Sequence, residues 1–256
     1  MIPRIIHYCW FGRGPMPALA EDCIASWRRL CPDYEIRLWC EDSFDISSNP
    51  YVKEAYEAKK YAFVTDYVRL YALYTVGGVY MDTDVELVKP LDGLLSNEVF
   101  SGFESKDKIP TAVMGAVAGH KTVKYLLDYY EDRHFLLADG SYDTTTNVEI
   151  ITNMMLERGL RQDGELQTVD GFTLYPSHIL CPVLSRIEDK AYMRDAVAIH
   201  HFMGSWKSER AKSRESSRIF RILTYPIRLL SRLLTAIFGK RWTGLKNRLR
   251  AKIFRD

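Results

Sequence analysis

The residues best suited to chemistry in this chain are two aspartates one residue apart, Asp82 and Asp84, after a short apolar segment. The apolar residues 79–81 predict a strand, and side chains alternate along a strand, so the two carboxylates should lie on one side. Such a pair suits Mg2+ or Mn2+, which take oxygen ligands and leave positions free for phosphate oxygens. A D-x-D triplet alone is weak, because it arises by chance and also fits a solvated turn.

The stretch before this pair makes the metal interpretation stronger. It predicts a helix from Tyr61 that is apolar on most of its surface and is therefore packed on most sides. Asp66 and Arg69 stand three residues apart on one face of that helix, where they can pair with each other or be presented together to a ligand. Gly77 and Gly78 follow as a helix stop.

Hydrophobic periodicity predicts the elements that position these residues. Strands are expected at residues 2–10, 34–39, 99–103, 113–118, 172–175 and 196–202, and further helices at 18–30, 50–60, 121–131 and 143–157. The opening strand, helix and strand form a βαβ unit, which favours a parallel or mixed sheet covered by helices. The predicted fold class is α/β.

Polar and aromatic residues crowd the end of the last predicted strand. Of His200 and His201, alternation lets only one face a bound ion, and a neutral imidazole suits Mn2+ beside carboxylates; a histidine pair is otherwise a surface feature. Lys207 can lie against a phosphate. Trp10, which ends the first strand beside a glycine turn, is either a core residue or a platform for a nucleobase.

Length and composition predict one substantial catalytic core, since 47% of the 256 residues are apolar. The five cysteines form no C-x-x-C pair, which favours a reducing compartment over a zinc site or a disulfide scaffold. The first residues show no signal-peptide pattern, and no charge-free run is long enough to span a bilayer. We therefore expect a cytoplasmic protein.

Charge divides the chain into two parts. Residues 206–256 contain fifteen Lys and Arg against three Asp and Glu, a net charge of +12, whereas the rest contains twenty against thirty, or −10. We expect a catalytic domain at 1–205 and a basic amphipathic helical tail at 206–256. Such helices suit an anionic membrane surface, in the plane of the interface. The alternative is that the tail docks on the catalytic domain or on a second subunit.

Four ordered blocks resemble a known family. They are IPRIIHYCWFG, the D-x-x-R helix with GGVYMDTD, GSYDTTTNVEIIT and AIHHFMGSW. Residues 2–207 resemble the bacterial members of glycosyltransferase family 32, the DXD-containing sugar transferases of capsule and lipopolysaccharide gene clusters. Yeast outer-chain mannosyltransferases and, more distantly, the clostridial glucosylating toxins are similar to it in the core pattern.

The resemblance implies a GT-A fold that holds a nucleotide-sugar and a divalent metal, and transfer with retention at the anomeric carbon. It implies that Asp82 and Asp84 hold Mn2+ and the diphosphate, and that Asp66 and Arg69 grip donor-sugar hydroxyls. The remaining site residues carried over by the resemblance are Trp10 over the uracil, His201 as third metal ligand, Ser205, Trp206 and Lys207 near the leaving phosphate, and Asn147 near the donor sugar.

The expected function is therefore a retaining, metal-dependent glycosyltransferase with a UDP-linked donor and a saccharide acceptor. The acceptor is expected to be lipid-linked, for capsule or O-antigen synthesis at the inner face of the bacterial inner membrane. One alternative is an effector-like protein glycosyltransferase. The other is a non-enzymatic protein whose basic tail binds nucleic acid or membrane, although the tail is too apolar for an arm that follows phosphates, so no nucleic-acid partner is expected.

Overall fold

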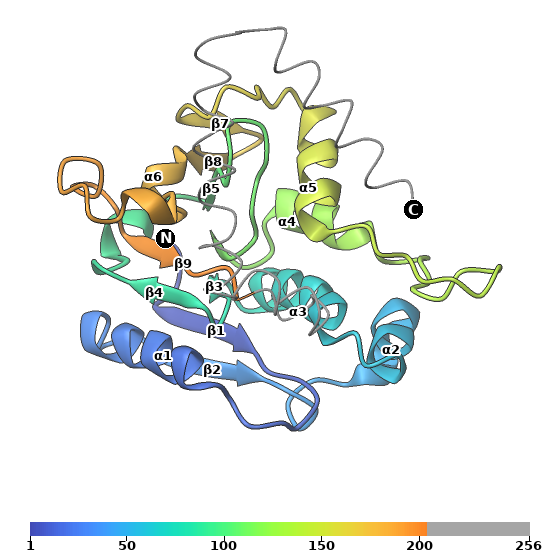
Figure 1. The fold of residues 1–256 in the computed structure, drawn as a ribbon. Helices are drawn as coiled ribbons and strands as arrows, with labels where there is room; N and C mark the ends of the chain where they lie inside the picture. The colour runs from blue at the N-terminus through green and yellow to red at the C-terminus, as the bar shows by residue number, and fades with distance from the viewer. Residues whose placement is uncertain (204–256) are drawn as a thin grey trace, which may run out of the picture. The chain divides into compact units, whose positions relative to one another are not determined.

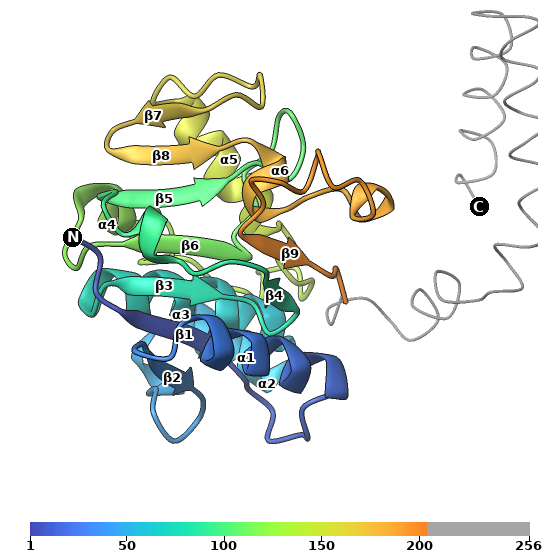
Figure 2. The same cartoon turned by 90° about the vertical axis from the view of Figure 1, so that its left-hand side faces the viewer.

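A computed structural model of the chain describes residues 1–203, whose centre is a seven-stranded mixed sheet (Figure 1, Figure 2). The order across it is β2 (Glu35–Trp39), β1 (Ile5–Cys9), β3 (Gly78–Met81), β6 (Val113–Ala116), β5 (Val99–Gly102), β8 (Phe172–Tyr175) and β7 (Gln167–Val169). The β1 strand runs parallel to β2 and β3, and β5 runs parallel to β8. The β6 strand is antiparallel to both its neighbours, and β7 is antiparallel to β8. A separate antiparallel pair is formed by β4 (Val85–Leu87) and β9 (Ala198–His200).

Helices cover both faces of the large sheet. They are α1 (Ala18–Leu30), α2 (Pro50–Glu57), α3 (Tyr61–Thr75), α4 (Lys121–Asp128), α5 (Asn147–Leu156) and the short α6 (Ser177–Leu180). One core cluster joins the sheet to α2, α3, α4 and α5, and the other joins its opposite face to α1 and β4. Side chains alternate along β3 and so contribute to both clusters: Tyr80 lies in the first, and Val79 and Met81 lie in the second. The predicted α/β fold class is confirmed.

Several elements are shorter than the sequence predicts, because hydrogen bonding rather than apolar character fixes their ends. The first strand covers 5–9 instead of 2–10, and the helix predicted at 121–131 ends at 128. The helix predicted at 143–157 begins at Asn147, because the Thr146 hydroxyl accepts from the Glu149 N–H (3.3 Å) and caps it. The strands β4 and β7 were not predicted.

The connection from α3 to β3 places the paired aspartates. The α3 helix ends at Thr75, and the predicted glycine break follows at Gly77 and Gly78, with φ of 74° and 114°. Beneath Gly78 lies the fully buried His7, whose Nδ1 accepts from the Trp39 indole N–H (3.0 Å). Nε2 therefore carries the proton and donates to the Gly77 carbonyl (2.7 Å). This histidine joins β1, β2 and the turn that begins β3.

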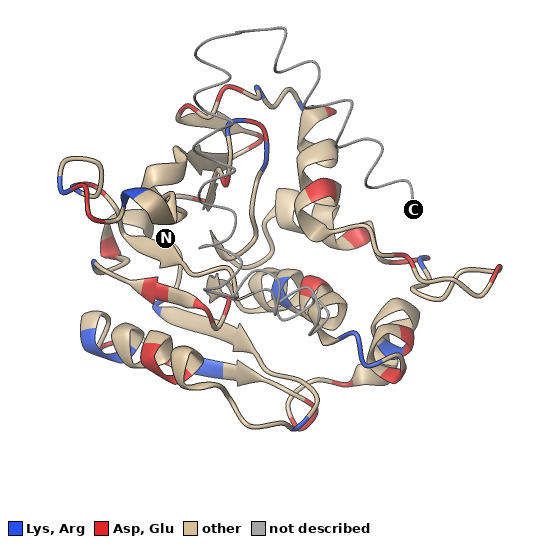
Figure 3. Cartoon of the chain, viewed as in Figure 1, with Lys and Arg blue, Asp and Glu red and all other residues tan. Residues whose placement is uncertain are grey.

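The sequence of α3 contains one acidic and one basic residue, and Figure 3 shows red and blue on this helix. They are Asp66 and Arg69. Within residues 1–203, no helix combines the length and the hydropathy that crossing a bilayer requires. The predicted tail at 206–256 and its boundary at 205 lie outside the described residues and stay predictions.

Candidate active site

Asp82, Asp84 and His200 form the group in residues 1–203 that can hold a metal ion. One oxygen or nitrogen from each lies within 4.8 Å of the others. Asp82 directly follows β3, Asp84 directly precedes β4, and His200 ends β9. The antiparallel pairing of Val85 with His200 brings the imidazole to the aspartates across a long stretch of sequence. The D-x-D aspartates therefore meet a histidine from β9, a strand that the sequence predicts at 196–202 but whose pairing with β4 only the structure shows.

Asp84 is held by hydrogen bonds from the β9 end. Its Oδ2 accepts from the Met203 N–H (2.7 Å), and its Oδ1 lies 3.3 Å from His200 Nε2. Burial raises the pKa of Asp84, but the hydrogen bonds from His200 and Met203 outweigh burial and hold the pKa below its usual value. Asp84 is therefore an ionised carboxylate in a fixed position, which suits it to bind a cation.

The surroundings of the His200 imidazole favour a positive charge. Burial alone lowers the pKa of His200, but the hydrogen bond to Asp84, the contact with the Cys181 side chain and the charges of Asp84 and Asp82 outweigh it and raise the pKa to about 10. Positive charge is thus favoured between the carboxylates, and a divalent cation can replace the proton. The His200 Nδ1 atom is buried and has no hydrogen-bond partner among the described residues. Two carboxylates and one imidazole are a donor set that Mn2+ accepts.

Arg69 connects Asp66 to Asp82. Its Nη2 lies 3.1 Å from Asp66 Oδ1 and its Nη1 lies 3.3 Å from Asp82 Oδ1, while Nη1 also donates to the carbonyl and hydroxyl oxygens of Thr111 (2.7 Å each). The guanidinium stands over the Tyr80 ring, 4.6 Å from its centroid, and the Tyr80 hydroxyl donates to Asp82 Oδ1 (2.8 Å). Only 5% of the Arg69 side chain is exposed. The pairing predicted from the D-x-x-R spacing is present, and it extends to the D-x-D aspartate.

Asp66 and Asn147 form the far end of this network. Burial raises the pKa of Asp66 to about 7, in spite of the nearby positive charge of Arg69. Asn147, the first residue of α5, points its amide N–H at the Asp66 carbonyl (3.5 Å), and its Oδ1 is buried with no partner among the described residues. An unpaired buried acceptor is costly, so this end of the network is suited to a hydroxyl from a ligand.

The structure corrects the prediction of His201 as third ligand, because His200 and not His201 joins the aspartates. The two neighbouring side chains point to opposite sides of β9. The His201 Nε2 atom lies 3.0 Å from Glu86 Oε2, and both residues line a cavity of about 350 Å3 against α1. Its backbone N–H donates to the Asp84 carbonyl (2.9 Å), which continues the pairing of β9 with β4.

Two groups of predicted residues stand apart from this network. Trp10 follows β1 and is half-buried, with its indole N–H donating to the Gly14 carbonyl (2.7 Å), so its contact lies in the adjoining glycine turn. Its role as a nucleobase platform stays a prediction. Ser205, Trp206 and Lys207 lie outside the described residues.

Tyr80, Thr111 and His200 were missed as site residues from sequence. Tyr80 could have been found, because it precedes Asp82 by two positions and so shares its side of the strand. His200 was named as one of a pair, but alternation could not say which histidine faces the ion. Thr111 gives no signal, since it reaches Arg69 only through the folding of a distant loop.

Comparison with known proteins supports the interpretation of the central stretch. The match is to the family described as "Glycosyltransferase sugar-binding region containing DXD motif". It covers residues 17–101. The matched residues include Asp66, Arg69 and the paired aspartates, whereas Asn147 and His200 lie beyond them.

Two relatives with similar sequences are yeast proteins. The chain is 32% identical over 151 residues to inositol phosphoceramide mannosyltransferase 3 of Schizosaccharomyces pombe, with 56% of this chain and 42% of the relative aligned. It is 30% identical over 144 residues to mannosyl phosphorylinositol ceramide synthase SUR1 of Saccharomyces cerevisiae, with 50% and 36% aligned. The chain thus spans less than half the length of these relatives. Among solved structures, the PaToxG glycosyltransferase aligns with a TM-score of 0.45 and 16% identity, over 61% of this chain and 69% of its own.

Proposed function

We propose that this protein is a metal-dependent glycosyltransferase of the GT-A type that transfers a sugar from a nucleoside diphosphate to an acceptor hydroxyl. The observation that carries the proposal is the convergence of Asp82, Asp84 and His200 within 4.8 Å at the C-terminal end of β3. This group lies beside the pair of Asp66 and Arg69. The match of residues 17–101 to a sugar-binding region supports it.

The metal would be held by Asp82, Asp84 and His200. A divalent cation in such a site supplies positive charge that stabilises the negative charge developing on the departing diphosphate. Asp82 also accepts from the Tyr80 hydroxyl and faces Arg69, so its orientation is fixed before any ligand arrives. Asp82 would therefore be positioned in advance to hold the cation that binds the phosphates.

The donor sugar would lie against Asp66, Arg69 and Asn147. A carboxylate, a guanidinium and an amide offer acceptors and donors for sugar hydroxyls. The buried Asn147 Oδ1 has no hydrogen-bond partner among the described residues and could accept from one of them. In the reaction, the bond from the anomeric carbon to the phosphate oxygen breaks and a bond to the acceptor oxygen forms. The acceptor proton passes to the departing phosphate. Retention, which the resemblance implies, fits such a front-face route, in which positioning replaces a protein nucleophile.

The identities of donor and acceptor are further parts of the proposal. A UDP-linked donor and Mn2+ follow from the resemblance, whereas the names of the yeast relatives make mannose the first sugar to test. Those names also describe a lipid-borne acceptor for the relatives, which agrees with the lipid-linked acceptor expected here. A role in bacterial surface polysaccharide synthesis, at the cytoplasmic face of the inner membrane, stays a proposal.

A thermal-shift screen tests the function. UDP, GDP, UDP-glucose, UDP-galactose and GDP-mannose are each added with Mn2+ or with EDTA, because a bound ligand raises the melting temperature with its occupancy. We expect a Mn2+-dependent rise with one nucleotide class, which is lost in Asp84→Asn. Glu86→Gln, an acid two residues along that is outside the ligand group, should keep the rise. Turnover of nucleotide-sugar by Asp84→Asn at the wild-type rate would refute the proposal.

A further inference from the structure

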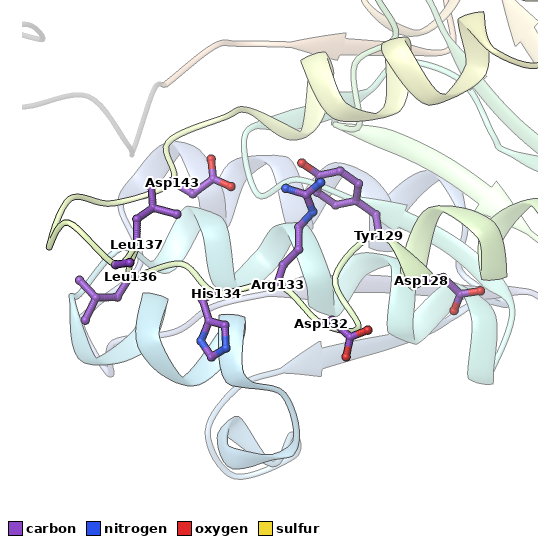
Figure 4. A pocket seen from close by; sticks show the side chains of 9 residues that line it. Asp128, Tyr129, Asp132, Arg133, His134, Leu136, Leu137 and Asp143 are labelled. Carbon is purple, nitrogen blue, oxygen red and sulfur yellow. The ribbon is translucent and has the colours of Figure 1, made fainter.

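An open cavity of about 750 Å3 lies beside the active site, between the end of α4 and the segment that leads to α5 (Figure 4). Its walls include Tyr129, Arg133, Leu136, Leu137 and Asp143. None of these residues belongs to the metal or donor network described above. The size of the cavity is within the range of small-ligand sites.

The segment that forms the cavity, residues 132–143, is fixed to the body of the protein. Glu54 on α2 binds it twice, through His134 Nδ1 (2.6 Å) and the Leu136 N–H (2.9 Å). Phe135 is fully buried and stacks on Tyr142, with ring centroids 5.1 Å apart and planes 17° apart. These anchors hold the wall in place without a ligand, so the cavity is preformed.

The cavity combines groups that suit a saccharide. The Arg133 guanidinium lies over the Tyr129 ring, 3.9 Å from its centroid, and Figure 4 shows Asp143 across the opening from this pair. Leu136 and Leu137 add apolar surface that is 47% and 42% exposed. Hydroxyl groups can donate to the carboxylate and accept from the guanidinium, while the C–H face of a sugar ring packs on apolar and aromatic surface.

The charges of the cavity argue against an anion as its ligand. Three aspartates, Asp128, Asp132 and Asp143, line it with a single arginine. A phosphate or a nucleotide would meet more negative than positive charge there. A neutral polyol meets no such penalty.

The cavity connects to the donor network through intermediate residues. Asp143 precedes the Thr146 cap of α5 by three residues, and the next residue is Asn147, which faces Asp66. On the other wall, the rings of Tyr129 and Tyr130 have centroids 5.1 Å apart. Tyr130 in turn contacts Tyr67, the neighbour of Asp66, with centroids 5.9 Å apart. A molecule in the cavity therefore lies next to the elements that would hold the donor sugar.

We propose that this cavity binds the acceptor as a neutral saccharide, with Asp143 and Arg133 as its polar contacts and with Leu136 and Leu137 as its apolar surface. The assignment as acceptor site rests on the proposed function. Binding of the saccharide itself does not need the donor and can be measured alone.

Two matched pairs of variants test the proposal. Asp143→Asn is compared with Asp139→Asn, because each aspartate accepts from the backbone N–H two residues on (3.0 and 2.9 Å), and Asp139 is outside the cavity. Arg133→Ala is compared with Arg158→Ala, since Arg158 also covers a tyrosine of α4 (Tyr125, 4.1 Å) and is outside the cavity. In both aspartate variants, the Asn side chain keeps the backbone hydrogen bond and removes only the negative charge.

Binding is measured by saturation-transfer NMR with the methyl glycosides of mannose, galactose and glucose, and donor hydrolysis is measured separately with Mn2+. We expect at least one glycoside to bind, and Asp143→Asn and Arg133→Ala to weaken it about fivefold or more, the difference between a charged and a neutral hydrogen bond. The control variants should bind as the wild type does. Donor hydrolysis should be unchanged in all four variants.

The outcomes separate the two proposals. Saccharide binding that depends on Asp143, in a protein that hydrolyses no nucleotide-sugar, would keep the saccharide site and reject the transferase function. Donor hydrolysis with no glycoside bound, or with equal losses in the cavity variants and their controls, would overturn the acceptor site alone. Loss of donor hydrolysis in Asp143→Asn would place this residue in the donor site and also overturn the assignment.

Discussion

Arg69 joins two aspartates that the sequence separates by most of a helix and a strand. It is buried, contacts both carboxylates and lies on the Tyr80 ring. A buried charge needs such partners, because removing any one leaves the others uncompensated at a cost of about 3–5 kcal/mol. The network therefore fixes the position of Asp82 whether or not a ligand is present.

The choice between the two histidines is testable by metal binding. His200→Ala removes a nitrogen of the ligand group and should weaken Mn2+ binding by at least about tenfold, whereas His201→Ala removes a contact with Glu86 and should leave it nearly unchanged. Isothermal titration calorimetry with Mn2+ measures both. The reverse ranking would show that His201 is the ligand and that β9 rearranges when metal binds.

Asp66 should make stability depend on pH in a definite direction. Its pKa is raised to about 7, so its contribution to stability is present below its unfolded pKa of about 4 and is lost as the pH rises through 7. Asp66→Asn cannot ionise. The free energy of unfolding of the wild type, relative to Asp66→Asn, should thus fall between pH 5 and pH 8. Urea unfolding in EDTA at both pH values measures it, and a constant difference would contradict the raised pKa.

At the residue scale, local spacing predicted the site only in part. The pairs of Asp66 with Arg69 and of Asp82 with Asp84 follow from helix and strand periods, which depend on neighbours alone. The selection of His200 and the contact of Thr111 with Arg69 depend on which distant segments meet. The periodicity of a segment does not predict which distant segments it contacts.

At the scale of elements, the turn between α3 and β3 depends on a close approach that only glycine permits. A Cβ on Gly78 would lie 2.7 Å from the Ile5 carbonyl oxygen and 2.9 Å from His7 Nε2, and the φ of 114° adds strain. Gly140 also has a positive φ (81°), but it has open space around it. The two positions separate the cost of the backbone angle from the cost of packing.

Gly78→Ala should therefore destabilise the protein more than Gly140→Ala, by about 1–3 kcal/mol for the added packing clash. Urea unfolding of both variants gives the comparison. Because the turn positions β3, Gly78→Ala should also weaken Mn2+ binding, and Gly140→Ala should not. Equal destabilisation would mean that His7 and β1 move aside without cost.

The elements themselves were predictable where the apolar pattern is long. The α1 and α3 helices and the strands at β1, β2 and β8 lie within a few residues of their predicted places. The three-residue strands β4 and β7 were missed, since a run of that length has no measurable period. The β4 strand matters most, because its pairing with β9 brings His200 beside Asp82 and Asp84.

At the scale of the whole molecule, the charge division predicts two separable activities. Removing residues 218–256 takes away most of the basic apolar tail, so binding to anionic vesicles should be lost while Mn2+-dependent donor hydrolysis is kept. Co-sedimentation with phosphatidylserine vesicles and a hydrolysis assay measure the two. Continued sedimentation of the truncated protein would assign membrane binding to residues 1–217 instead.

The pairing of β4 with β9 has a consequence for how the protein is made. More than a hundred residues separate Asp84 from His200. At the usual rate of translation, the ribosome needs roughly 6 to 20 seconds to add them. During that interval the nascent chain carries both aspartates and Arg69 but not His200, so it cannot yet form the complete group of Asp82, Asp84 and His200. The proposed metal site would therefore be completed late in biosynthesis, and a chain whose translation stops before β9 would retain the D-x-D sequence without His200 beside it.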